Sequence, residues 1–535
     1  MPIWKILGNF PAEFCTFNGS CLRHATAHTH QRCSQLKKSL MNKISILLLI
    51  IFSLSFKISL SQNFGNFPEI EKQKLHNDLE ILYQGLDKFH SGMYWYTPKD
   101  SVDNAFKKVK SLINKDMNVL EFHKLIAPLV ALSREDHTDI YLPKSAKEKI
   151  NKESTFIPLT FVFLGTKLYC VKNGSNYQKL IIEGKEIESI NGEKPIDIVG
   201  KIGNLFASDG YIKTVKYSDL KGFSFSKYYF YYYGNTKQVN IKFKELENPI
   251  IIESLKIENI NKHLRLRNTN NKVDKEKELL EFKILNPTTA YLGLHSFSNS
   301  DIKKETKEKS LRKFLENSFK SISDNNITNL IIDVSENGGG TEGNEGIVYS
   351  YLGDNYQKYK KVRAKTQKAI LDNGIDKPIT LKTFGFLQRT FVNKKMTDGS
   401  LERKQWIGYG LMAYKKEPKN KFSGKVYVII SPITYSGGSE FSNMVYSNDK
   451  GIFVGQETGG GYFGNTSGYI KELTLPNSHI EIDIPALQFV MNVEQKLPFG
   501  SGVIPDHKVI PTFEQYLNNV NAPLEYILKQ IENEK

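Results

Sequence analysis

The sequence is poor in cysteine. Only four cysteines occur in 535 residues, and three of them, Cys15, Cys21 and Cys33, lie near the N-terminus. Cys170 is the single thiol beyond residue 61, so a chain that begins there cannot form an internal disulfide. The composition, with 40% hydrophobic and 24% charged residues, is that of a globular protein long enough for two or three domains.

A long hydrophobic run is also missing. The apolar stretch of residues 46–52 is far shorter than the roughly 20 residues that span a bilayer, and Lys57 follows it closely. It comes after Met41-Asn42-Lys43 and before Ser59-Leu60-Ser61, the order of basic start, apolar segment and cleavage site of a secretory signal peptide. We therefore expect residues 41–61 to be cleaved on export, to the periplasm or the extracellular space, rather than kept as a membrane anchor.

A signal peptide normally begins its chain, which places the true start at Met41 and makes residues 1–40 a mis-assigned upstream start. This stretch imitates a metal-binding pattern, with Cys21, His24, His28, His30 and Cys33. No fold is predicted around these side chains, so we expect no metal site there. We expect no cofactor.

Positive charge is abundant but not concentrated. The formal net charge is +16, and the first 61 residues carry seven Lys and Arg against Glu13, which leaves about +10 beyond them. The excess is spread through mixed-sign segments such as residues 272–281 and 301–309, without basic clusters that interleave with aromatic residues. The pattern is typical of solvated helix faces and argues against nucleic acid as a partner.

The fingerprints of phosphate and dinucleotide binding are absent as well. A predicted strand at residues 330–334 runs into Ser335-Glu336-Asn337-Gly338-Gly339-Gly340, but no Gly-Lys-Ser or Gly-Lys-Thr follows. Consecutive glycines permit positive φ and bring backbone N–H groups close to a bound group. Gly338 and Gly339 are therefore candidates for an oxyanion hole, in which N–H donors stabilise a negatively charged oxygen.

The chain contains three successive patterns. Leu75, Leu79, Leu82 and Leu86 share one helix face, and two more helices are predicted near residues 106–112 and 122–129. Short β-rich runs follow at residues 160–163, 167–171 and 239–243. Beyond them, strands predicted at residues 289–294, 330–334, 426–430 and 452–454 alternate with helices predicted at 303–323, 345–352 and 441–447.

The alternation predicts an α/β domain with parallel strands. The predicted boundaries are a helical domain at 62–150, a β-rich domain at 151–260, a linker at 261–285, the α/β domain at 286–520 and a C-terminal helix or tail at 521–535.

Within the β-rich region, Gly184-Lys185-Glu186-Ile187-Glu188-Ser189-Ile190-Asn191-Gly192 resembles a signature of PDZ domains. In such domains a strand, a tight turn and a helix build a groove for an extended peptide end. A simple β-hairpin with an Asn-Gly turn is the other interpretation.

Ser436 occupies a predicted strand-to-helix turn, in Ser431-Pro432-Ile433-Thr434-Tyr435-Ser436-Gly437-Gly438-Ser439-Glu440. Such a turn exposes a hydroxyl that a base and an oxyanion hole can convert into a nucleophile. An ordinary helix N-cap is the alternative. The triple glycine favours the nucleophile, because the carboxyl ends of parallel strands meet at one sheet edge.

Three ordered blocks resemble the tail-specific (C-terminal processing) serine protease family: the triple glycine, the Ser436 turn and Val454-Gly455-Gln456-Glu457-Thr458-Gly459-Gly460. The resemblance covers residues 287–512. It implies a ClpP/crotonase-like α/β-spiral catalytic domain, with Ser436 as nucleophile and Gly437, Gly338 or Gly339 as oxyanion donors.

Many members of that family use a lysine base soon after the third block, whereas residues 459–465 contain no lysine here. The tricorn-like branch takes a histidine from an N-terminal Asp-Gly-His-Thr-like motif, which Asp136-His137-Thr138 resembles although the glycine is missing. The resemblance makes His137 the candidate base and places Glu494 as its supporting acid. Glu440 and Glu457 are alternatives, and Asp136 serves only if its backbone places it against the histidine.

The resemblance implies a secreted serine-type peptidase that hydrolyses protein or peptide substrates through an acyl-enzyme. The alternative is a catalytically inactive family member that acts as a ligand carrier or as a PDZ-type peptide-binding protein. No stable membrane anchor is expected after signal cleavage, and the sequence does not set the oligomeric state.

Overall fold

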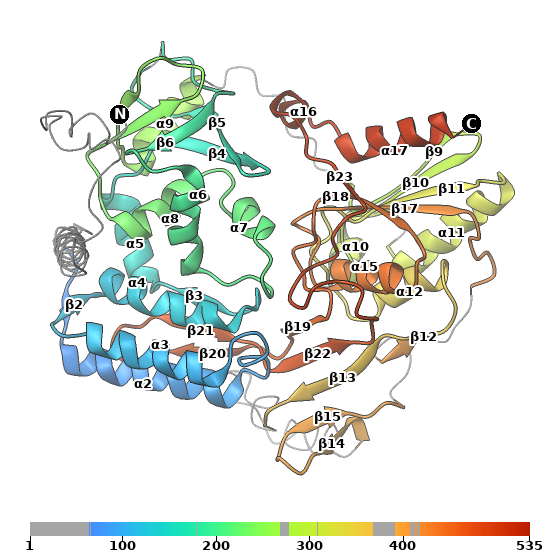
Figure 1. Cartoon of the computed structure of the whole chain (residues 1–535), viewed down its shortest axis with the longest axis horizontal. Coiled ribbons are helices and arrows are strands. Elements are labelled where there is room, and N and C mark those ends of the chain that lie inside the picture. Colours follow the sequence, from blue (N-terminus) through green and yellow to red (C-terminus); the bar gives the residue numbers. More distant parts are fainter. Residues whose placement is uncertain are drawn as a thin grey trace, which may run out of the picture. The chain divides into compact units, whose positions relative to one another are not determined.

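The computed structural model describes residues 64, 66–177, 179–267, 278–307, 309–366, 391–406, 412–414 and 418–534 (Figure 1). All of these residues belong to one compact unit, Asn63–Lys535. The predicted upstream stretch and signal peptide, together with their three cysteines, lie outside the described residues. Within the described part, Cys170 is buried and forms no disulfide. No helix of that part combines the length and hydrophobicity that crossing a membrane requires.

The three helices predicted near the N-terminus are present as α2 (Lys72–Phe89), α3 (Lys99–Leu112) and α4 (Val119–Val130). Their buried leucines and phenylalanines form one hydrophobic cluster. Asn118 and Glu121 form a capping box that begins α4. After α4 the chain passes through the short helix η2 (Ala131–Ser133) and turns at Arg134, whose φ is 52°.

Two strands from far along the chain join these helices. β20 (Lys471–Thr474) and β21 (Glu481–Ile484) pair with each other, and β21 pairs antiparallel with β3 (Asp139–Tyr141). Figure 1 places both strands beside α2, and residues between Leu473 and Ile484 contribute to the helical core. The predicted boundaries place residues 471–484 in the α/β domain, because the sequence of one strand does not show which strand it pairs with.

The β-rich region is a five-stranded antiparallel sheet in the order β4-β5-β6-β7-β8. Its strands are Leu159–Leu164, Lys167–Asn173, Glu186–Ile190, Gln238–Phe243 and Ile250–Glu253. Asn191 and Gly192 have positive φ and form the predicted tight turn before α6 (Pro195–Ile202). The predicted order of strand, turn and helix is therefore present, while the PDZ identity stays a prediction.

Several further helices complete the N-terminal half. They are α5 (Lys144–Glu153), η3 (Gly203–Leu205), α7 (Thr214–Asp219), α8 (Ser224–Tyr233) and α9 (Ile257–Arg267). The predicted linker at 261–285 is in part the end of α9 and in part β9 (Leu280–Asn286), and residues 268–277 lie outside the described residues.

The predicted α/β region is built on a six-stranded sheet in the order β23-β18-β17-β11-β10-β9. The strands are β10 (Thr289–Leu294), β11 (Asn329–Asp333), β17 (Lys425–Ile430), β18 (Ile452–Gly455), β23 (His507–Lys508) and β9. All pairs are parallel except that of the edge strand β9. The predicted parallel α/β arrangement is thereby confirmed.

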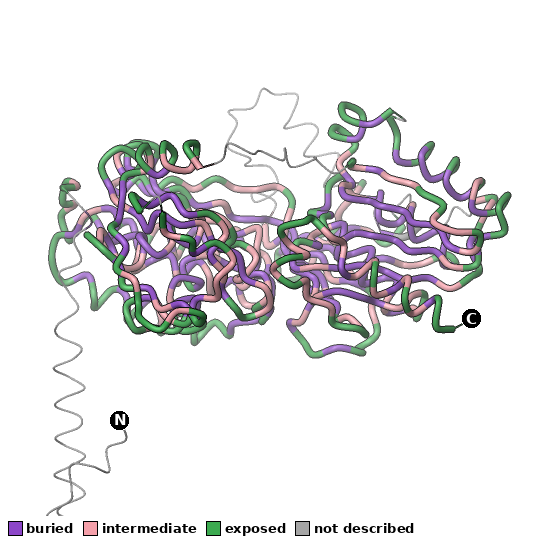
Figure 2. Tube along the Cα trace, turned by 90° about the horizontal axis from the view of Figure 1, so that it is seen from above, coloured by how far each residue is buried: buried purple, intermediate pink, exposed green. Residues whose placement is uncertain are grey.

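Both faces of this sheet are covered, and Figure 2 shows buried residues along its strands. One face packs against α11 (Leu311–Asp324), α12 (Asn344–Ser350) and α15 (Gly437–Ser447). The other face packs against α17 (Ala522–Asn533) through Ile527 and Ile531. The helix predicted at 303–323 is two helices, α10 (Asn299–Glu305) and α11, because the Ser310 side chain caps a new start.

A second sheet and short pairs complete the fold. The sheet has the order β14-β15-β13-β22-β19. Its strands are Asn393–Lys395, Leu401–Arg403, Tyr359–Ala364, Leu487–Met491 and Gly464–Ser467. The short elements are β1 (Glu69–Ile70) with β2 (Met117–Asn118), β12 (Tyr356–Gln357) with β16 (Ala413–Tyr414), and helix α16 (Phe513–Leu517).

Candidate active site

Ser436 lies between the end of β17 and the start of α15, as the sequence predicts. Its backbone has φ 46° and ψ −121°, a region that non-glycine residues rarely occupy. The side chain makes no capping hydrogen bond to the helix. The alternative of an ordinary N-cap is therefore not supported, and the strained turn presents a half-buried hydroxyl without a local partner.

The triple glycine after β11 lies directly against this turn. Asn337 links the two segments, since its carbonyl oxygen accepts the N–H of Tyr435 at 2.9 Å and its Oδ1 accepts the N–H of Gly339 at 2.8 Å. Its Nδ2 donates to the Leu294 carbonyl at 2.8 Å, which ties the loop to β10. Three neighbouring parallel strands thus fix the position of the glycines relative to Ser436.

The N–H groups of the glycines differ in availability. Those of Gly437 and Gly338 donate no hydrogen bond within the described part of the chain. The N–H of Gly339 is occupied by Asn337. Gly437 and Gly338 are therefore the donors that can face an oxyanion, and Gly339 contributes its lack of a side chain instead.

His137 follows the Arg134 turn, and hydrogen bonds hold the residues on both sides of it. The Asp136 N–H donates to Asp209 Oδ1 at 2.8 Å, and Thr138 Oγ1 is hydrogen-bonded to His90 Nε2 at 2.7 Å. The Nδ1 atom of His137 is buried without a hydrogen-bond partner. No hydrogen bond joins His137 to Ser436 among the described residues, as is common in serine enzymes without substrate.

Two contacts bring the histidine segment to the serine turn. The Tyr435 O–H lies 3.5 Å from Asp136 Oδ1, so the residues that precede Ser436 and His137 meet. Gly461 donates its N–H to Asp209 Oδ2 at 3.0 Å, and a Cβ on the adjacent Gly460 would lie 3.3 Å from the Ser436 nitrogen. Segments some 300 residues apart therefore converge on one site.

Asp209 is a site residue that the sequence did not reveal. It is fully buried, and burial raises its pKa while the charge of His137 and the N–H groups of Asp136 and Gly461 oppose the rise. Asp209 and the half-buried Asp139 both interact electrostatically with the imidazole, as the acid of a serine–histidine centre does. No motif marks it, because Asp209 stands in a loop between η3 and α7.

Two further carboxyl groups directly precede His137, of which Glu135 is buried and Asp136 is half-buried. Burial, Asp209 and Asp219 raise the pKa of Asp136 to about 8. Burial and Asp209 raise the pKa of Glu135 well above its usual range, although its Oε2 accepts the Thr466 N–H at 2.7 Å. Such clustered, perturbed groups are typical of functional sites. Even so, no group of His, Cys, Asp and Glu within the described ranges is arranged to hold a metal ion.

The structure places Glu494 elsewhere. Its side chain is 73% exposed and pairs with Lys496 at 3.6 Å. Its N–H donates to Ser447 Oγ at 2.9 Å, at the opposite end of α15 from Ser436 and roughly 16 Å along that helix. The prediction that Glu494 supports His137 is therefore corrected, since its exposed side chain lies at the far end of α15 and Nδ1 of the histidine has no hydrogen-bond partner.

The alternatives Glu440 and Glu457 are also occupied. Glu440 accepts the Tyr359 O–H at 2.7 Å and the Asn465 amide at 3.2 Å. Glu457 accepts the N–H of Gly502 at 3.1 Å. Neither contacts His137 in the described structure.

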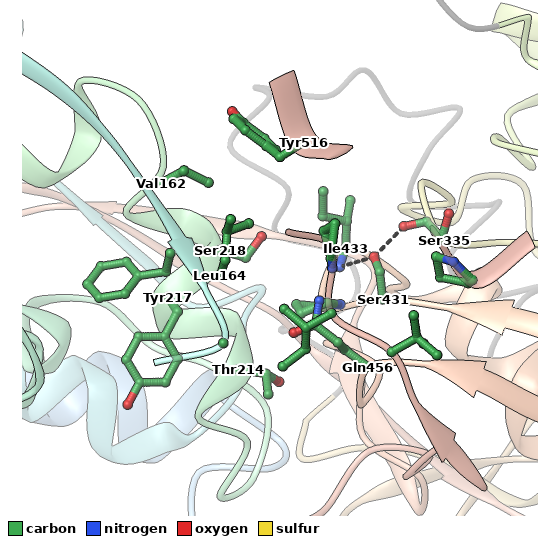
Figure 3. A pocket seen from close by; sticks show the side chains of 18 of the residues that line it. Val162, Leu164, Thr214, Tyr217, Ser218, Ser335, Ser431, Ile433, Gln456 and Tyr516 are labelled. Atoms are coloured by element: carbon green, nitrogen blue, oxygen red, sulfur yellow. Dashed lines mark hydrogen bonds between the residues drawn. The ribbon is translucent and has the colours of Figure 1, made fainter. Parts of the chain in front are cut away.

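A separate pocket of about 540 Å³ lies at the carboxyl ends of β11, β17 and β18. Figure 3 shows Val162 and Leu164 of β4 and Tyr217 of α7 on one side, with Ser335 and Ile433 on the other. β4 is an edge strand, and Phe161 exchanges N–H and C=O bonds with Gly222 at that edge. The backbone of Phe163, two residues on, points to the same open edge.

The chain is similar to a known protein family and to solved structures. The model of Peptidase family S41 matches residues 288–509. The fold is similar to mature CPAF (12% identity, 85% of this chain and 95% of that chain, TM-score 0.56). It is also similar to mature CPAF complexed with lactacystin (13% identity, 86% of this chain and 99% of that chain, TM-score 0.57). No curated protein matches the chain.

Proposed function

The chain is a serine peptidase of family S41 by its residues 288–509, and from this premise we propose that it is an active endopeptidase with a serine–histidine centre. The predicted family is confirmed at this level. The finer assignments, which are the ClpP/crotonase-like spiral and the tricorn-like branch without a Ser/Lys dyad, belong to the proposal. They are supported by the absence of lysine from residues 459–465. The contact between Asp136 and Tyr435, which brings the segment of His137 to the Ser436 turn, also supports them.

In the proposed reaction, His137 removes the Ser436 proton and the alkoxide attacks a peptide carbonyl carbon. The N–H groups of Gly437 and Gly338 stabilise the oxyanion. His137 then protonates the leaving amine, and water hydrolyses the acyl-enzyme to regenerate the serine. Asp209 replaces Glu494 as the acid that stabilises the imidazolium during both proton transfers.

One observation carries this proposal: the strained backbone of Ser436 holds an uncapped hydroxyl against the glycine turn that offers free N–H groups. A cap or a purely structural serine needs no such strain, whereas strain at functional turns persists because the surrounding fold supports it.

The test uses fluorescein-labelled casein and a fluorophosphonate probe of nucleophilic serines. We expect the wild type to hydrolyse the casein and to be labelled, Ser436→Ala to lose both, and His137→Ala to lose roughly 10²-fold or more in rate. Ser101→Ala and His507→Ala, at exposed positions, are the matched controls and should retain full activity. Unchanged hydrolysis in both active-site variants would falsify the assignment.

A second candidate function is peptide binding by a PDZ-like region, favoured by the pocket beside the open edge of β4. An extended peptide can add to such an edge through backbone hydrogen bonds. Binding of labelled casein peptides to the Ser436→Ala protein tests it. Phe163→Pro removes one edge donor and should weaken binding, whereas Phe163→Leu should not. If the wild type neither cleaves nor labels and binds no peptide, a ligand carrier is the better interpretation.

We also propose export through cleavage after residue 61. The support is the sequence order of basic start, apolar segment and small residues at positions 41–61. N-terminal sequencing of the protein from the producing cell, after separation of cytoplasm, periplasm and medium, tests this. A protein that keeps residues 41–61 inside the cell contradicts it.

A further inference from the structure

A buried lysine lies beside the turn that carries Ser436. Lys358 stands between β12 and β13, and its side chain is 2% exposed. Its ammonium forms an ion pair with Glu345 in the first turn of α12 and another, at 3.6 Å, with Glu440 in the first turn of α15. Both carboxylates are buried. One cation and two potential anions are therefore enclosed together.

Hydrogen bonds fix these groups in place. Both carboxylate oxygens of Glu345 accept the Gly343 N–H, at 2.9 and 3.0 Å, and Glu440 accepts the Tyr359 O–H at 2.7 Å. Burial lowers the pKa of Lys358, but Glu345 and Glu440 outweigh it and raise that pKa above its usual value. The lysine thus stays protonated, and it serves as a charge rather than as a base.

The cluster is close to the proposed oxyanion site. A Cβ built on Gly437 would lie 3.7 Å from Glu345 Oε2, and the Glu440 N–H donates to the Ser436 carbonyl oxygen at 2.8 Å. A negative charge close to the Gly437 donor repels an oxyanion bound there, and repulsion is weakly screened inside a protein. Burial raises the pKa of Glu345 to about 7, while Lys358 opposes that rise and Glu440 adds to it. Without Lys358 the cluster would hold uncompensated negative charge, which opposes the reaction.

We infer that Lys358 is a positioning residue: it neutralises Glu345 and Glu440, so that the oxyanion formed on attack by Ser436 meets the Gly437 N–H without an uncompensated buried negative charge close to it. This inference rests on the proposed function. It assigns to a buried lysine outside the family blocks an electrostatic role, distinct from the base that other family members take from their downstream lysine.

The test compares kcat and KM on fluorescein-labelled casein. Lys358→Met keeps the length of the side chain without its charge and should lower kcat roughly 10- to 100-fold, with KM changed less than about 3-fold. The triple variant Lys358→Met/Glu345→Gln/Glu440→Gln removes all three charges and should recover kcat to within about 5-fold of wild type. Lys425→Met, at the exposed Glu534 ion pair, is the matched control and should retain wild-type kinetics.

Each outcome decides. If Lys358→Met is as active as wild type, this inference fails while the proposed function stands. If the triple variant melts like wild type but is as slow as Lys358→Met, the lysine acts through shape and the charge argument is overturned. If the single variant does not fold, the triple variant alone decides, because it leaves no buried charge unpaired. A wild type that neither cleaves nor labels overturns the proposed function and this inference together.

Discussion

A Cβ atom built on Gly339 would lie 2.5 Å from the Cβ of Ser436 and 2.9 Å from the nitrogen of Gly437. Real Cβ atoms do not approach other atoms so closely, and the φ of Gly339, 100°, is itself unfavourable for any side chain. The glycine turn after β11 and the serine turn after β17 are therefore in contact at a point that only glycine fits. This closeness is what an oxyanion hole built from two turns requires.

Gly339→Ala should separate the two turns. We expect casein hydrolysis to fall at least about 100-fold, as when an oxyanion donor is lost, together with a lower melting temperature. Gly338→Ala is the matched variant for stability, because a Cβ there meets nothing within 4 Å, and it should melt like wild type. A Gly339→Ala protein with wild-type rate and melting temperature would show that the contact is unnecessary.

The assignments of Asp209 and of Glu494 as the acid that supports His137 predict opposite results. Asp209→Asn removes the buried charge beside the imidazole and should lower kcat roughly 10²- to 10⁴-fold. Glu494→Gln changes a side chain that is 73% exposed and should leave kcat within about 2-fold. Casein hydrolysis by both variants decides between them. A large loss in Glu494→Gln with none in Asp209→Asn would restore the assignment made from the family resemblance.

The glycine turn after β11 and the serine turn after β17 could be predicted from the sequence, because their positions follow from the order of the strands alone. Both come directly after buried strands, and β11 and β17 are parallel neighbours, so their carboxyl ends share an edge. The first of the N-terminal helices could equally be predicted, because its leucines repeat on one face.

Asp209 and the β20–β21 pair could not be predicted, for a common physical reason. Asp209 is held in the site by a hydrogen bond from Gly461, 252 positions away, and β21 pairs with β3 across a longer span still. Neither contact leaves a local pattern in composition or periodicity. Glu494 was misplaced for the converse reason, since sequence spacing from Ser436 does not fix where a loop residue lies in space.

The packing of α17 against the sheet gives a test of the fold. Ile527 and Ile531 are buried with Tyr291, Ile331 and Tyr427, so α17 packs against this face of the sheet. Ile527→Ala should lower the free energy of unfolding by about 2–5 kcal/mol, measured by chemical denaturation. Leu517→Ala, at a residue that is 54% exposed, is the control and should change it by less than about 1 kcal/mol. Equal effects would contradict the docking of α17.

The buried carboxyl of Asp136 predicts a specific pH dependence of stability. Burial, Asp209 and Asp219 raise its pKa to about 8 from an ordinary value of 3.8. The unfolded chain therefore ionises first as pH rises, and the folded state loses stability progressively between about pH 4 and pH 8. The other groups that act on this carboxyl are Asp139, Lys216 and Tyr435.

Asp136→Asn removes the titration, so its melting temperature relative to wild type should rise steadily from pH 4.5 to pH 8. Thermal unfolding followed by circular dichroism across that range measures the difference. The matched control Asp197→Asn, at an exposed position in the first turn of α6, should show a small offset at every pH. An Asp136→Asn offset that is constant, or that shrinks as pH rises, contradicts a carboxyl held neutral by burial beside His137.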